Sequence, residues 1–300
     1  MCIFASEIKK MNKICFTKVS NYLSLVKFAH TIFALPFAFI GYCISINPQH
    51  PFEWKLFLLL LGCMFFARNA AMAFNRFIDR EYDKSNARTA FREIPSQIIK
   101  PFSALNFVII NSIIFVIFTG FINSLCLILS PVALLVILGY SYTKRFTSLS
   151  HLLLGLGLSL APIGAYLAVT SRFDVLPLIF SALVLTWVAG FDIIYSLQDY
   201  EFDKSNGLKS IPAFLGITGA LRISIFLHIL SAGLTLFAGW FGNFGNIYFG
   251  GAFLFIGMLI YQHLLVKPND LSHLNLAFFT TNGIASLVFA AFTITDIFLK

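Results

Sequence analysis

Long apolar runs separated by short polar segments form the dominant pattern of this chain. A helix that crosses a bilayer needs about 20 consecutive apolar residues. Such runs cover residues 22–46, 54–79, 102–122, 124–143, 150–170, 175–197, 219–240, 246–266 and 275–298. The pattern therefore predicts an all-α integral membrane protein with about nine transmembrane helices. Residues 1–20 are predicted to form a short basic N-terminal segment, and residues 21–300 a single membrane domain.

The composition agrees with a membrane protein. Hydrophobic residues make up 58% of the 300 residues and charged residues 11%, whereas a soluble domain has about 25% charged residues. The mean hydropathy is +0.85. The five cysteines stand singly, with no CxxC pair and no metal-ligand spacing with histidine. Neither a disulfide framework nor a zinc site is therefore predicted.

Lysine and arginine are distributed unevenly between the two ends of the predicted spans. Sixteen of the 21 lie in the N-terminal segment and in the segments that follow the second, fourth, sixth and eighth spans. Because these residues are enriched in cytoplasmic loops, the N-terminus and these loops are predicted to be cytoplasmic. The membrane is expected to be a bacterial inner (plasma) membrane. The net charge of +8 is mostly this asymmetry, so nucleic acid is not a predicted partner, whereas membrane lipid is.

One acidic sequence occurs twice in the chain. Residues 77–86 read FIDREYDKSN, and residues 197–206 read LQDYEFDKSN. We call these the first and the second acidic motif. Each ends a predicted span that runs toward the cytoplasm, and the offset of 120 residues corresponds to four spans. The chain is therefore predicted to contain an internal parallel repeat, with both motifs at the same membrane depth on the same side.

Acidic residues, together with Asn75 and Tyr195, recur at helical spacing in both segments. In the first, they are Asn75, Asp79 and Asp83; in the second, they are Asp192, Tyr195, Asp199 and Asp203. Residues three or four apart share one face of a helix, so two helix ends are predicted to direct carboxylates toward each other across a cavity. Clustered carboxylates need a cation, and oxygen ligands suit Mg²⁺, which completes its shell with water and substrate phosphates. The alternative is two solvated acidic loops.

Two ionisable residues lie deeper in the predicted spans. Arg68 precedes Asp79 by eleven residues, roughly 16 Å along a helix. Asp192 precedes Asp199 by seven residues, or roughly 10 Å. Ionisable groups at such depth usually line a polar cavity, and an ion pair between helices is the alternative.

These segments resemble the motifs of the UbiA superfamily of membrane prenyltransferases. Residues 68–83, RNAAMAFNRFIDREYD, resemble its first motif, NxxxDxxxD with an upstream arginine, and residues 192–203, DIIYSLQDYEFD, resemble its second, DxxYxxxDxxxD. Residues 140–144, YSYTK, resemble its YxxxK signature. Residues 88–96, RTAFREIPS, resemble its RTxxRPLPS loop, but Glu93 stands where proline is usual. This departure is expected to loosen the loop.

The resemblance implies a bundle of nine transmembrane helices around a central cavity. The implied donor is a polyprenyl diphosphate, the acceptor an aromatic acid and the cofactor Mg²⁺. Around the second motif the chain is most similar to the 4-hydroxybenzoate polyprenyltransferase branch, which serves quinone biosynthesis. Prenylation of a dihydroxynaphthoate in the futalosine route to menaquinone stays open as an alternative. The length of the prenyl chain and the oligomeric state are not predicted.

The resemblance also implies roles for individual residues. Mg²⁺ would be held by Asn75, Asp79, Asp83, Asp199 and Asp203. The diphosphate would bind to Lys144, Arg145, Arg88 and Tyr140. Arg68 would hold the acceptor carboxylate, and Asp192 would orient Arg68 or Tyr195 or take part in proton removal. The aromatic candidates for stabilising an allylic cation are Phe74, Phe77, Phe191 and Tyr195.

Other readings of the chain predict other features. A secondary transporter also contains repeats and intramembrane charges, but near the midplane, whereas most acids here lie at the predicted rim. A CDP-alcohol phosphotransferase would hold its acids in one compact motif. The histidines at positions 30, 151, 228 and 273 stand alone in the sequence and receive no role. Gly155 and Gly157 are expected to permit close helix packing.

Overall fold

The structure is a computed structural model, and it describes residues 20–26 and 33–300. The predicted N-terminal segment lies almost entirely outside the described residues, as does His30. Within the described residues the elements are helices, with no β-strand. The predicted all-α class is therefore confirmed.

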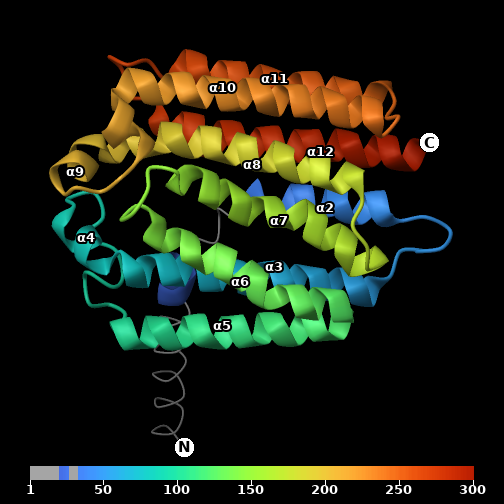
Figure 1. Ribbon diagram of the computed structural model, residues 1–300, viewed down its shortest axis with the longest axis horizontal. Helices are drawn as coiled ribbons and strands as arrows, with labels where there is room; N and C mark the ends of the chain where they lie inside the picture. Colours follow the sequence, from blue (N-terminus) through green and yellow to red (C-terminus); the bar gives the residue numbers. More distant parts are fainter. Residues whose placement is uncertain (1–19, 27–32) are drawn as a thin grey trace, which may run out of the picture.

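The helices follow one another with short connections (Figure 1). Their bounds are α2 Leu35–Ser45, α3 Trp54–Ile78, α4 Arg80–Ser85, α5 Pro101–Ile122, α6 Ser124–Thr143, α7 Ser150–Thr170, α8 Val175–Ser196, η2 Leu197–Asp199, α9 Tyr200–Ser205, α10 Ile211–Phe241, α11 Asn246–Leu265, η3 Leu276–Thr280 and α12 Thr281–Leu299.

Eight helical segments are long and apolar enough to cross a membrane. They correspond to the second to ninth predicted spans, so the protein is an integral membrane protein. The first predicted span contains α2, which has only 11 residues, and residues 27–32 before it lie outside the described part of the chain. The seventh span begins eight residues earlier than predicted, because Ser210 caps α10 by accepting a hydrogen bond from Ala213 N, and Pro212 lies in the first turn. Gly216, with φ of 72°, interrupts the helical backbone there.

α8 lies at the centre of the bundle and packs against α7 and α10. Fifteen of its 22 residues are buried. Trp187 is fully buried, and its Nε1 donates to Oδ1 of Asn282 on α12 at 3.1 Å. A Cβ atom at Gly155 would lie 2.5 Å from the carbonyl oxygen of Leu185, whereas one at Gly157 would meet its nearest neighbour, Ile137, at 3.8 Å. The predicted packing role is confirmed for Gly155 and not for Gly157.

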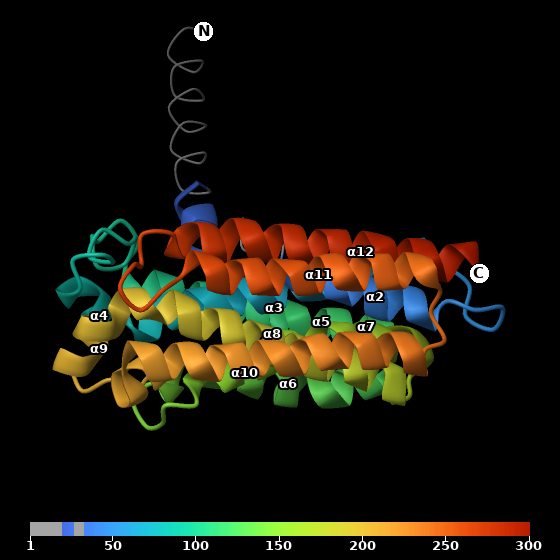
Figure 2. The ribbon, with the colours of Figure 1, turned by 90° about the horizontal axis from the view of Figure 1, so that it is seen from above.

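α3 and α8 run in the same direction and end at the same end of the bundle. There the short helices α4 and α9 lie side by side (Figure 1 and Figure 2). The C-terminus lies at the opposite end. The placement predicted for the internal parallel repeat is therefore confirmed, and both acidic motifs face one region.

Candidate functional site

A cavity of about 250 Å³ opens at the end of the bundle that carries both acidic motifs. Its walls come from α3, α6, α7 and α8, and its rim from the two motifs and the loop after α4. All twelve predicted site residues line it: Arg68, Asn75, Asp79, Asp83, Arg88, Tyr140, Lys144, Arg145, Asp192, Tyr195, Asp199 and Asp203. The structure therefore brings together residues that are far apart in the sequence.

The first motif turns the chain at the end of α3. Asp79 follows the last residue of α3 with φ of −86° and ψ of 5°, and α4 begins at the next residue. Asn75 donates from Nδ2 to Oδ2 of Asp79 at 3.0 Å, as expected for residues four apart on one helix face. One helical turn later, Asp83 is buried, with 6% of its surface exposed. The motif thus presents one carboxylate at the turn and one beneath it.

The second motif repeats this conformation after α8. A single 3₁₀ turn, η2, carries the chain from α8 to Asp199, whose φ and ψ are −103° and 8°. α9 begins at the next residue, and Asp203 within it is 2% exposed. Asp199 and Asp203 therefore occupy the same local positions as Asp79 and Asp83.

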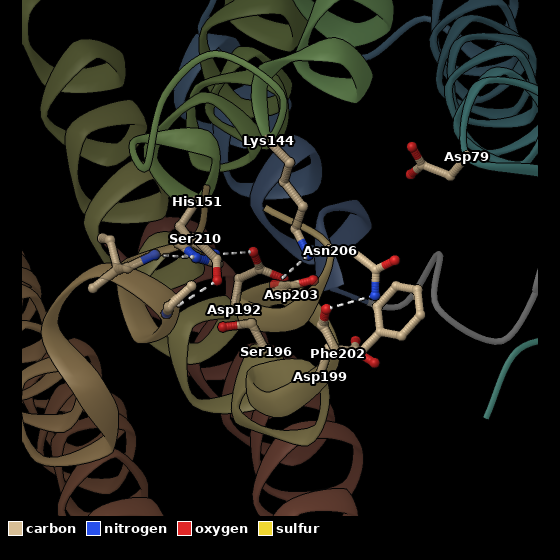
Figure 3. Close-up of polar contacts among 12 residues, drawn as sticks. Asp79, Lys144, His151, Asp192, Ser196, Asp199, Phe202, Asp203, Asn206 and Ser210 are labelled. Carbon is tan, nitrogen blue, oxygen red and sulfur yellow. Dashed lines mark hydrogen bonds and ion pairs between the residues drawn. The ribbon is translucent and has the colours of Figure 1, made fainter. Parts of the chain in front are cut away.

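Four basic side chains lie among these acids. Arg88 makes a bidentate contact with Asp199, from Nε to Oδ1 at 3.0 Å and from Nη2 to Oδ2 at 2.5 Å. The other pairs are Arg92 Nη1 with Asp83 Oδ1 at 2.6 Å, Lys144 Nζ with Asp203 Oδ2 at 3.5 Å and Arg145 Nη2 with Asp79 Oδ1 at 3.6 Å. Figure 3 shows Lys144 extending toward Asp203, with Asp79 set apart from the second motif. Arg92 was not among the predicted site residues, although it lies in the loop that resembles a family motif.

Burial and neighbouring charges act in opposite directions on these groups. Burial raises the pKa of Asp79 to about 6, although nearby Lys144 favours the ionised form. For Lys144, burial lowers the pKa, but the carboxylates of Asp203 and Asp199 more than offset it, and the net pKa is raised. The pKa of Arg88 is likewise raised, because Asp199 outweighs the effect of burial. Lys144 and Arg88 therefore keep their positive charge and can meet an anionic substrate.

The donor set at the rim suits a hard divalent cation. Among the described residues, no group of three acidic, histidine or cysteine side chains is close enough to form a metal site by itself. However, within the described residues Oδ2 of Asp83 and Oδ2 of Asp203 are buried and accept no hydrogen bond, although Oδ2 of Asp203 lies 3.5 Å from Nζ of Lys144. Buried carboxylate oxygens are normally satisfied, and these two come from opposite motifs. A set of carboxylate oxygens with positions left for water and phosphate fits Mg²⁺. That the motifs share Mg²⁺ stays a prediction.

The deeper part of the cavity holds a second polar group. Arg68 and Tyr140 line it, and Nε of Arg68 is buried without a hydrogen-bond partner among the described residues. Asp192 lines it as well, and its Oδ2 lies 2.6 Å from Nδ1 of His151. His151, which stands alone in the sequence and was given no role, is therefore paired in the structure. His228 is not isolated either, since its Nδ1 lies 2.8 Å from Nε2 of His263. Sequence spacing gave no signal for either pair, because the partners lie on different helices.

Aromatic side chains form the apolar wall of the cavity. Phe191 and Tyr195 line it, as predicted. Phe74 instead stacks edge-on against Tyr142, and Phe77 lies beneath Arg80, and neither is among the described residues that line the cavity. In their place are Phe33 and Phe278. The Phe278 ring stacks on Tyr195 with 3.9 Å between centroids.

The loop after the first motif is held more firmly than predicted. Glu93 is buried, and its carboxylate accepts a hydrogen bond from Oγ of Ser24, 69 residues earlier in the chain. Its carbonyl oxygen accepts from Ile99 N at 2.9 Å. The expectation that Glu93 loosens the loop is therefore wrong, because the buried Glu93 side chain gains a hydrogen-bond partner from outside the loop.

Comparisons with known proteins agree on one family. The model of the UbiA prenyltransferase family matches residues 34–284. A 4-hydroxybenzoate octaprenyltransferase of Psychromonas ingrahamii is 27% identical over 281 residues, covering 93% of this chain and 98% of the relative. One of Tolumonas auensis is 28% identical over 238 residues, covering 79% and 83%.

Solved structures show the same fold. The apo structure of a UbiA homolog from Aeropyrum pernix K1 superposes with a TM-score of 0.81 at 32% identity, covering 89% of this chain and 98% of the homolog. A UbiA homolog from Archaeoglobus fulgidus bound to DMAPP and Mg²⁺ gives a TM-score of 0.73 at 22% identity, covering 93% and 100%. The second likeness supports the fold alone.

Proposed function

Because the chain belongs to the UbiA prenyltransferase family, we propose that it transfers a polyprenyl group from a polyprenyl diphosphate to an aromatic acid of the 4-hydroxybenzoate type, with Mg²⁺ as cofactor. One observation carries the proposal. A single cavity gathers the carboxylates of both motifs, with cations between them, above an aromatic wall. The names of the relatives from Psychromonas ingrahamii and Tolumonas auensis support 4-hydroxybenzoate as the acceptor type.

The rim of the cavity binds the diphosphate end of the donor. Asn75, Asp79, Asp83, Asp199 and Asp203 are the residues that would hold Mg²⁺. The buried Oδ2 atoms of Asp83 and Asp203, which accept no hydrogen bond from the described residues, support this assignment. When bound, Mg²⁺ acts as a Lewis acid that stabilises diphosphate as a leaving group. Lys144, Arg145 and Arg88 supply further positive charge, and Tyr140 lies in the wall below them. The exposed nitrogens of these cations can donate to phosphate oxygens.

The reaction replaces one bond to the prenyl group by another. The allylic C–O bond breaks, and its electron pair leaves with the diphosphate. A ring carbon of the acceptor bonds to the prenyl carbon, and the proton on that ring carbon leaves. Phe191, Tyr195 and Phe278 face the cavity and can stabilise the allylic cation through their ring faces. The apolar wall also excludes water that would otherwise capture this cation.

The deep end of the cavity binds the acceptor. Arg68 there has a buried Nε without a partner, and guanidinium suits a carboxylate in a bidentate geometry. Asp192 lies near the same end and takes up the ring proton. Tyr195 lies between this end and the rim, and Arg88 lies over its ring with 5.8 Å to the centroid. The diphosphate and the acceptor therefore bind at opposite ends of one cavity.

The orientation in the membrane follows from charge. We assign both motifs and the N-terminus to the cytoplasmic side of a bacterial inner (plasma) membrane, because lysine and arginine concentrate in the segments at that end. We treat residues 21–300 as one membrane domain that follows a short basic segment. Both water-soluble substrate parts then reach the cavity from the cytoplasm, while the prenyl tail lies in lipid.

A prenyl-transfer assay tests the proposal. Membranes that contain the protein would receive a labelled polyprenyl diphosphate, Mg²⁺ and either 4-hydroxybenzoate or 1,4-dihydroxy-6-naphthoate. We expect a prenylated 4-hydroxybenzoate that disappears with EDTA and in Asp79→Ala and Asp199→Ala. The matched control is Asp174→Ala, which changes the N-cap carboxylate at the start of α8, away from both motifs.

The outcomes separate the alternatives. Product from the naphthoate only would assign the chain to the futalosine route. Release of diphosphate without either product would retain the metal site and reject both acceptors. No diphosphate release from folded protein would contradict the proposed reaction and favour the transporter reading.

A further inference from the structure

His151 is buried behind the cavity and connects three helices. It is the second residue of α7 and has no exposed surface. Its Nδ1 lies 2.6 Å from Oδ2 of Asp192 on α8, and its Nε2 accepts a hydrogen bond from the backbone N–H of Ile211, the first residue of α10, at 3.4 Å. Figure 3 shows the His151 side chain directed toward the Asp192 carboxylate.

The contact with Ile211 determines how the ring meets Asp192. A backbone N–H can only donate, so Nε2 is the acceptor nitrogen and the ring proton of neutral histidine lies on Nδ1. Nδ1–H therefore donates to Asp192. A ring with its proton on Nε2 would place two donors face to face and leave Nδ1 opposite a carboxylate. The start of α10 thus fixes the tautomer that Asp192 requires.

Asp192 uses only one of its oxygens in this contact. Oδ2 is the atom that meets His151, and no described residue donates a hydrogen bond to Oδ1. The Asp192 side chain is 20% exposed and lines the cavity, whereas His151 does not line it. The arrangement leaves one carboxylate oxygen for the cavity and holds the other from behind.

We propose that His151 is a positioning residue for Asp192, which it holds by donating from Nδ1 to Oδ2 so that Oδ1 faces the acceptor. The inference rests on the proposed function, because it assigns Asp192 the ring proton of the aromatic acid. His151 does not touch a substrate and takes no proton itself. It resembles the outer partners that orient ligands and bases in other enzymes, whose loss typically lowers activity about 10- to 100-fold.

Three substitutions at position 151 test the proposal in the prenyl-transfer assay. His151→Leu fills a similar volume without either hydrogen bond, and we expect kcat to fall about 10- to 100-fold with little change in KM for either substrate. His151→Asn places its amide Nδ2 near the position of Nδ1, and we expect it to recover most of this loss. If the His151→Leu protein does not fold, His151→Ala takes its place, and we expect the same loss of kcat. Ser159→Ala is the matched control, because its hydroxyl is buried on the same helix and bonds only to Leu156 O.

A second comparison separates positioning from packing. If His151 acts through Asp192, then His151→Leu should change kcat by no more than about twofold in an Asp192→Asn background, since contacting residues are not additive. Three results would overturn the inference. The first is a full loss of kcat for His151→Leu in the Asp192→Asn background. The second is a kcat for His151→Asn no higher than that for His151→Leu, and the third is wild-type kcat for all three variants. If Asp192→Asn has no measurable turnover, the kcat of His151→Asn relative to that of His151→Leu tests the inference instead. Absence of product from the wild-type protein would overturn the proposed function instead.

Discussion

The two acidic motifs have the same local conformation in different surroundings. Asp79 and Asp199 each stand between a long and a short helix, with φ and ψ of −86° and 5° in the first motif and −103° and 8° in the second. One turn later, Asp83 and Asp203 are both buried. The repeated sequence therefore produces the same turn twice.

The difference lies in what holds each motif. α8, which carries the second motif, is buried over 15 of 22 residues, whereas α3, which carries the first, is buried over 7 of 25. Asp83 pairs with Arg92 from the loop of its own motif. Asp199 pairs with Arg88, which also comes from the loop of the first motif, and Asp203 pairs with Lys144 at the end of α6. The second motif thus follows a well-buried helix, but the cations that pair with it, Arg88 and Lys144, come from the first half of the chain. The second motif therefore depends on the first half for its charge balance.

The largest effect should come from the buried acids that the motifs share. Asp83→Asn and Asp203→Asn each remove charge at a buried carboxylate whose Oδ2 accepts no hydrogen bond from the described residues. We expect each to lower prenyl transfer about 100- to 1,000-fold, as is typical when preorganised electrostatic groups are lost, and to weaken activation by Mg²⁺ in a titration.

Each motif contains a matched control for this comparison. Glu81→Gln and Glu201→Gln change exposed acids two residues before the buried ones, and we expect both to keep near wild-type activity. A large loss in only one of Asp83→Asn and Asp203→Asn would show that one motif alone binds the metal.

Substitution of Arg88 should weaken the link between the motifs. Arg88→Lys keeps the charge but loses the bidentate contact with Asp199. A hydrogen bond to a charged group contributes about 1.5–3 kcal/mol, so we expect kcat/KM for the polyprenyl diphosphate to fall about 10- to 100-fold. The control is Arg92→Lys in the same loop, which has one contact and stays within the first motif. Equal effects of the two substitutions on kcat/KM would contradict the proposal that Arg88 links the two motifs.

The support of α8 is tested through its packing on α7. Gly155→Ala forces a Cβ atom toward the backbone of α8 at Leu185 O, whereas Gly157→Ala adds a Cβ in ordinary contact with Ile137. Overpacking of this kind costs about 1–3 kcal/mol. We expect a lower melting temperature for Gly155→Ala in detergent and an unchanged one for Gly157→Ala. Similar melting temperatures for both variants would show that α7 can move away from α8.

The sequence predicted the features that depend on periodicity and repetition. Apolar runs predicted the spans, and the duplicated acids with Arg68, Tyr140 and Lys144 predicted the cavity. These features are visible because each is carried by spacing along one helix or by a repeated motif. The start of α10 was missed although Ser210 and Pro212 are ordinary start signals.

The remaining site residues depend on contacts between distant helices. His151 on α7 contacts Asp192 on α8, and the sequence around His151 does not predict this contact. Phe278 lies in η3, a π-helical turn before α12. A π turn changes which side chains share a face, so 3.6-residue periodicity cannot place it. Phe74 and Phe77 were predicted from nearness in sequence, and the turn of the helix directs them away from the cavity.

The smallest effect concerns the loop that supplies cations to both motifs. Ser24→Ala removes the part-buried hydrogen bond to Glu93, which is worth about 0.5–3 kcal/mol depending on the charge of the acceptor. Because the contact ties the loop to a distant segment, the substitution should loosen residues 86–100 and leave the second motif unchanged. We expect faster amide hydrogen exchange in residues 86–100, since local opening is governed by the contacts that hold a segment. Residues 206–210 after the second motif serve as the internal control. Faster exchange in both segments would mean that the two loops open together. The first loop would then stabilise the structure of the second motif in addition to supplying a cation to it.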